Sequence, residues 1–249
     1  MRVMIDWMLR LSGRGGVLLV GFSLLVHGGL AAESEKTAVP EIGVADATKE
    51  GRLPLNAQAM SQRAAKAFAA GDWKTAREVY EELLKLEPYN ALVWANLGAV
   101  EQQSGRLNEA VEAFEQSVRF NPALVQSWIA LGLAYSDRGD LYLAVSALTR
   151  AIHEDPVDAR PHNYLAIAMK RIGWTQAAQA ELQRAVELKE DYGIAHFNLA
   201  LTYLEQRPAA MELARRHYQR ARDLGVAADE IVELKLAATE REREPKTKE

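Results

Sequence analysis

Apolar and small residues fall on one face of each of two consecutive helical segments, and this two-helix pattern recurs every 34 residues. In the unit from 91 to 124, the first stripe has the spacing i, i+3, i+4, i+7 and consists of Trp94, Leu97, Gly98 and Glu101. Gly105 then supplies a permissive backbone position that ends the first helix, and Pro122 prevents the second helix from continuing. The second stripe consists of Ala110, Phe114 and Ser117. The pattern therefore predicts a helical hairpin.

Four columns of equivalent residues mark this period along the chain. The columns are Gly71, Gly105, Gly139 and Gly173; Ala76, Ala110, Ala144 and Ala178; Pro88, Pro122 and Pro156; and Trp94, Trp128, His162 and His196. A period of this length is typical of stacked units that bury each other's apolar faces. The small residues Gly98 and Ala110 stand where two helices must approach closely. We therefore expect an all-α solenoid.

The residues of one unit resemble the tetratricopeptide repeat. The resemblance rests on the series Trp94, Leu97, Gly98, Gly105, Ala110, Phe114 and Pro122, and on its copies in the other units. It implies a right-handed α-solenoid of about five helix hairpins, with unit boundaries at 57–90, 91–124, 125–158, 159–192 and 193–225. The first unit is a weaker copy, and the fifth carries a two-residue insertion in its turn at Gln206, Arg207 and Pro208.

Two further segments come after the array. We expect a closing helix over 226–240, with Asp229 as its N-cap. The segment 241–249 is almost entirely charged, and this composition predicts a disordered tail.

The N-terminus has the order of a secretory signal peptide. Three arginines come first (Arg2, Arg10 and Arg14), and the apolar run from Val17 to Leu30 and small residues follow. This order predicts a signal over 1–32, cleaved after Ala31 or Ala32, and an exported protein of the periplasm or the extracellular space. The alternative is an uncleaved segment, 17–32, that anchors the chain in an inner membrane. Residues 33–55 contain prolines and glycines without a sustained apolar period, which predicts a flexible linker.

The composition and the motifs argue against several classes of function. The chain has no cysteine, which excludes disulfides and thiolate metal sites, and its net charge of -4 lacks the basic footprint of a nucleic-acid binder. No catalytic or nucleotide-binding motif occurs after the signal. His162 and His196 stand in the tryptophan column, where packing explains them better than metal binding. We expect no cofactor, metal, small-molecule substrate or enzymatic activity; a hydrolase or sugar-binding activity is the alternative from another class.

The resemblance implies that the first helices of the units form a concave groove for a protein partner. We expect the partner-binding residues to be Leu92, Gln102, Gln126, Ile129, Leu133, Arg160, Asn163, Ile167, Lys170, Arg171, Phe197 and Leu201. The apolar members suggest docking of a helix or an extended peptide, unless superhelical curvature or the closing helix already buries them. Arg160, Lys170 and Arg171 suggest a local anion contact or plain surface charge. The predicted function is a scaffold or adaptor; a membrane-tethered assembly or secretion factor is the runner-up.

Overall fold

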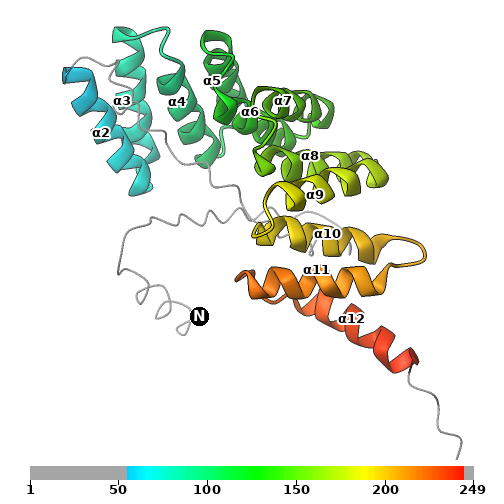
Figure 1. Ribbon diagram of the computed structural model, residues 1–249. Helices are drawn as coiled ribbons and strands as arrows, with labels where there is room; N and C mark the ends of the chain where they lie inside the picture. The colour runs from blue at the N-terminus through cyan, green and yellow to red at the C-terminus, as the bar shows by residue number, and fades with distance from the viewer. Residues whose placement is uncertain (1–54, 244–249) are drawn as a thin grey trace, which may run out of the picture.

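The computed structural model describes residues 55–243, which form eleven α-helices and no strand (Figure 1). The predicted signal peptide, residues 33–54 of the predicted linker, and residues 244–249 lie outside this range. The helices are α2 (Leu55–Ala69), α3 (Trp73–Leu86), α4 (Ala91–Gln103), α5 (Leu107–Phe120), α6 (Val125–Arg138), α7 (Leu141–Glu154), α8 (Ala159–Ile172), α9 (Thr175–Leu188), α10 (Gly193–Glu205), α11 (Met211–Asp223) and α12 (Glu230–Arg243). Within the described residues, no helix is both long and apolar enough to span a membrane.

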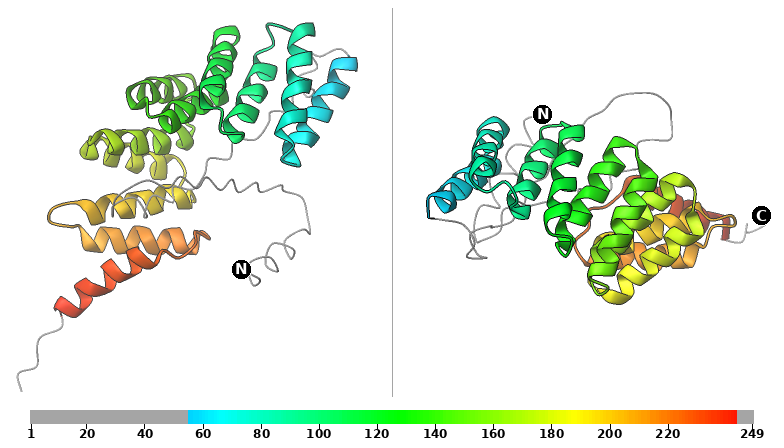
Figure 2. Two further views of the ribbon diagram at one scale, coloured as in Figure 1. Left: turned by 180° about the vertical axis from the view of Figure 1, so that it is seen from behind. Right: turned by 90° about the horizontal axis from the view of Figure 1, so that it is seen from above.

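Consecutive helices pair as antiparallel hairpins, from α2 with α3 to α10 with α11, and the hairpins stack along a curved path (Figures 1 and 2). The helix α12 crosses the end of the stack at an angle to α11. This architecture confirms the predicted α-solenoid of five hairpins with a closing helix. The first helices of neighbouring units also contact one another directly, as α4, α6 and α8 do, so they form the inner face and the second helices form the outer face.

The small residues of each hairpin let its two helices approach. A Cβ atom placed on Gly98 would lie 2.7 Å from the ring of Phe114, and one placed on Gly132 would lie 2.6 Å from Cγ of Leu148. Both of these large side chains are fully buried. The glycines in the first helix are therefore a packing requirement, because any side chain there would force the second helix away.

The aromatic column holds the loop that precedes each first helix. The indole Nε1–H of Trp94 donates to the carbonyl of Pro88 at 2.8 Å, and that of Trp128 donates to the carbonyl of Pro122 at 2.7 Å. His196 repeats this contact six residues after Glu190, with Nε2 3.2 Å from its carbonyl oxygen. Each ring thus fills the interior with its carbon atoms and uses its N–H group to satisfy a loop carbonyl.

The last two helices agree with most of the expected features. The start of α11 comes 18 residues after that of α10 (211 against 193), whereas α9 starts 16 residues after α8 (175 against 159), as a two-residue insertion requires. Asp229 caps α12, because its carboxylate accepts a hydrogen bond from the Val232 N–H at 3.0 Å. However, α12 continues to Arg243, three residues into the segment predicted as a disordered tail. Glutamate and arginine are good helix formers, so charge alone does not end the helix.

Candidate protein-binding groove

Apolar side chains of the predicted groove lie at equivalent positions of the first helices but differ in exposure. Leu92 on α4, Leu133 on α6, Ile167 on α8 and Leu201 on α10 are half-buried and keep part of their surface on the inner face. Two further side chains, Ile129 and Phe197, are only 2% and 8% exposed. Curvature thus encloses these two residues in the array, where they support the groove from below and offer a partner little direct contact.

Polar groove residues pair with one another across neighbouring units. Gln102 Nε2 donates to Asp137 at 2.7 Å, and the Asn198 amide donates to Asn163 at 2.8 Å. Arg160 Nη1 donates to the Gln126 carbonyl oxygen at 3.0 Å. The partners are 34 or 35 residues apart, so each bond joins one first helix to the next. We refer to these contacts as the inter-unit polar ladder.

Three basic side chains of the groove already have partners. Arg160 forms an ion pair with Asp158 at 2.6 Å, and Lys170 forms one with Glu205 at 2.9 Å. Arg171 Nη1 donates to the backbone carbonyl and the hydroxyl of Ser136, both at 2.7 Å. A partner's anion would therefore have to compete with these contacts. They extend the polar ladder, which fixes the spacing of α6, α8 and α10.

The electrostatics around Asp158 illustrate this competition. Burial by itself would raise the pKa of Asp158, but hydrogen bonds from the Arg160 side chain and backbone N–H outweigh it, so the pKa is lowered. The carboxylate is consequently held in its charged form beside the guanidinium.

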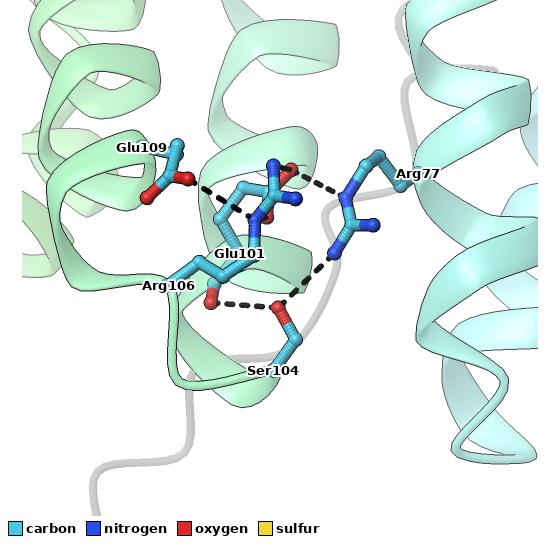
Figure 3. A network of polar contacts seen from close by, with 5 residues as sticks. All are labelled: Arg77, Glu101, Ser104, Arg106 and Glu109. Carbon is cyan, nitrogen blue, oxygen red and sulfur yellow. Dashed lines mark hydrogen bonds and ion pairs between the residues drawn. The ribbon is translucent and has the colours of Figure 1, made fainter.

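A second polar cluster, centred on Glu101 of α4, connects the first two units (Figure 3). The Glu101 side chain is only 3% exposed, and its carboxylate lies 2.8 Å from Nε of Arg77 on α3 and 2.7 Å from Nε of Arg106 in the turn after α4. Arg77 also approaches the Ser104 hydroxyl at 3.4 Å. In the sequence Glu101 appears only as one member of a packing stripe, at the position that Tyr135 occupies one unit later. Its ion pair with Arg77 depends on a contact between helices and has no local sequence pattern.

The interior contact of the aromatic column changes from apolar to polar along the array. Trp94 and Trp128 stand 19 residues before the buried residues Ala113 and Ala147 of the same hairpins. In the fourth unit the two equivalent side chains are His162 and Glu181, which are 2.6 Å apart.

In the fifth unit the same two positions are held by His196 and His217, with the insertion accounting for a separation of 21 residues. Their Nδ1 atoms lie 2.9 Å apart, and the rings stack. Burial, followed by the charges of His196 and Arg216, lowers the pKa of His217 to about 4. Across residues 55–243, His, Cys, Asp and Glu side chains form no group of three that could hold a metal ion.

Family models and solved structures with the same repeat match this arrangement. Tetratricopeptide-repeat models match residues 67–132 and 125–158. The chain is a tetratricopeptide-repeat protein. No curated protein matches its sequence.

Among solved structures, one of MamA superimposes on this tetratricopeptide-repeat protein with a TM-score of 0.59, at 23% identity over 65% of this chain and 93% of MamA. MamA 41-end from Desulfovibrio magneticus RS-1 gives 0.60, at 18% identity over 69% of this chain and 96% of that one. Pseudomonas aeruginosa pilF gives 0.67, at 16% identity over 75% of this chain and 85% of that one. At these identities the likeness concerns the fold. The fold itself is that of a protein-interaction scaffold.

Proposed function

We propose that this tetratricopeptide-repeat protein is an exported, non-enzymatic adaptor that binds an amphipathic helix or an extended peptide of a partner protein along its inner face. The observation that supports the groove is the row of half-buried apolar side chains on four consecutive first helices, namely Leu92, Leu133, Ile167 and Leu201. Their recurrence along the array gives a partner an apolar contact at each unit.

Apolar contacts and the polar ladder have different roles in this groove. Covering an apolar side chain fully contributes about 1.5 to 3 kcal/mol, so half-buried ones contribute less each and binding needs several of them. The polar ladder holds neighbouring first helices at fixed separations, as the pair of Asn163 and Asn198 does between α8 and α10. A groove held in this way needs little rearrangement on binding, which favours affinity.

Export rests on the order of residues in 1–32, where arginines, an apolar run and small residues follow one another. The intact mass of the protein from its native host provides the test. A loss of the first 31 or 32 residues is expected. A full-length species in the membrane fraction would instead support the tethered assembly or secretion factor.

Variants with matched controls test the groove. We expect Leu133→Asp to abolish capture of the partner from native extract, because the carboxylate would be buried against an apolar ligand. Leu143→Asp is the control, since Leu143 lies on α7 of the same unit and is 47% exposed away from the inner face. Both variants should retain the helical circular dichroism of the wild type. Equal capture by Leu133→Asp and the wild type would remove the inner face from the proposal.

A further inference from the structure

An open pocket of about 630 Å³ lies on the outer face of the array, bounded by the end of α9, the start of α10 and one side of α11. Its polar lining includes Glu190, His196, Arg216, His217, Arg220 and Asp223. None of these residues belongs to the groove on the inner face. The pocket is therefore a separate surface, and a role for it does not depend on the function proposed for the groove.

The local sequence of the fifth unit explains why a pocket occurs here. His196 stands in the slot that Trp94 and Trp128 occupy in earlier units, and an imidazole lacks the benzene ring of an indole. The position opposite, which is alanine in those units, is His217. The smaller ring leaves space between α9 and α11, and the polar pair lines that space with nitrogen atoms.

The two histidines form a directional chain of hydrogen bonds. Because a carbonyl only accepts, the contact of His196 Nε2 with Glu190 O at 3.2 Å places the proton of His196 on Nε2. Its Nδ1 then accepts from the Nδ1–H of His217 at 2.9 Å. His217 is left with a lone pair on Nε2, which has no partner within residues 55–243. Burial lowers the pKa of both histidines, so both are neutral at pH 7.

Positive charge in the pocket comes from two arginines one turn apart on α11. Arg216 forms no hydrogen bond or ion pair within the described residues, and Arg220 reaches only the carbonyl of Glu190, at 3.5 Å. By contrast, Arg184 on the outer face of the preceding unit pairs with Glu187 at 3.3 Å. Two guanidinium groups with unused donors suit a planar oxyanion, which they can hold with paired hydrogen bonds.

The acidic residues of the lining restrict the charge of the ligand. Glu190 and Asp223 balance the two arginines, so a dianion such as a phosphate would be repelled where a singly charged carboxylate would not. The free lone pair of His217 can accept a hydrogen bond from a donor close to that carboxylate. A glutamate or aspartate residue meets both requirements, with its side chain on the arginines and a backbone N–H on the histidine.

We propose that this pocket is a second binding site, which takes an acidic side chain from a polypeptide partner. The probe is an acetylated and amidated hexapeptide of alternating glutamate and glycine, compared with the same peptide carrying glutamine. Binding to the full chain is measured by fluorescence anisotropy and by the NMR signals of the arginine side chains. The glutamate peptide should bind, and the glutamine peptide should not.

Three variants locate the binding. Replacing both arginines (Arg216→Gln with Arg220→Gln) should weaken binding of the glutamate peptide by about tenfold or more, because charge-assisted hydrogen bonds are lost. Both side chains are exposed, so this double variant should keep its fold. Arg184→Gln, which removes an arginine outside the pocket, should bind as the wild type does. Leu133→Asp should also retain binding, which separates this site from the groove.

Four outcomes would overturn the proposal. The first is no binding of the glutamate peptide at millimolar concentration, and the second is equal binding by the double variant and the wild type. The third is an equal loss in Arg184→Gln, which would indicate general charge attraction. The fourth is displacement of the peptide by acetate at the same concentration, which would assign the pocket to small free carboxylates.

Discussion

Removing the Glu101 carboxylate is expected to uncouple the first hairpin from the second. The carboxylate is 3% exposed and binds two guanidinium groups, on Arg77 from α3 and on Arg106 from the turn after α4. In Glu101→Ala both arginines lose this partner, and a small cavity is left beside them.

The exposure of the arginines sets the size of the effect. Breaking a buried ion pair by removing one partner costs about 3 to 5 kcal/mol when the other charge stays buried. Here the side chains of Arg77 and Arg106 are 20% and 42% exposed, so water can hydrate them in part. We therefore expect a loss of about 3 kcal/mol for Glu101→Ala, at the low end of that range, and about 1 to 2 kcal/mol for Glu101→Gln, which keeps the shape.

Urea denaturation measures the loss, and hydrogen exchange locates it. Because units of a solenoid contact only their neighbours, the loss of protection should concentrate in α2, α3 and α4. Glu109→Ala is the control, since Glu109 is 48% exposed and meets Arg106 only at 3.4 Å. A loss below about 1 kcal/mol for Glu101→Ala, or one no greater than in the control, would refute the reasoning, because exposed pairs contribute at most that much.

The remaining predictions concern packing and pH. Gly132→Ala should destabilise the third hairpin by about 1 to 3 kcal/mol, because the new Cβ would lie 2.6 Å from Leu148; an unchanged denaturation midpoint would contradict this contact. Trp128→Phe should cost about 1 kcal/mol through loss of the indole bond to a loop carbonyl at 2.7 Å, measured in the same assay. His217 has its pKa lowered from 6.5 to about 4, so the unfolded chain binds more protons between these values and stability falls as the pH falls from 6.5 to 4. Hydrogen exchange of α10 and α11 over this range should show the loss, and His217→Gln should flatten it.

Local sequence rules determined the repeat and its punctuation. The glycine, alanine and proline columns state where helices cross, approach and end, and these requirements act within one hairpin. For the same reason the insertion before α11 and the Asp229 cap could be read from neighbouring residues alone. The predicted tail was wrong for 241–243, where α12 continues, because a charged segment can still be helical.

Only the tertiary structure decided which side chains remain available on the surface. Ile129 and Leu133 both lie on the inner side of α6, yet the first is buried and the second half-buried, because exposure depends on how far the neighbouring helices approach. The bond between Glu101 and α3, the polar ladder and the histidine pair join residues 21 to 35 positions apart, on different helices. A period shows that helices stack, but the curvature of the stack determines which polar groups meet. The pocket beside α11 likewise exists only because two helices are held apart there.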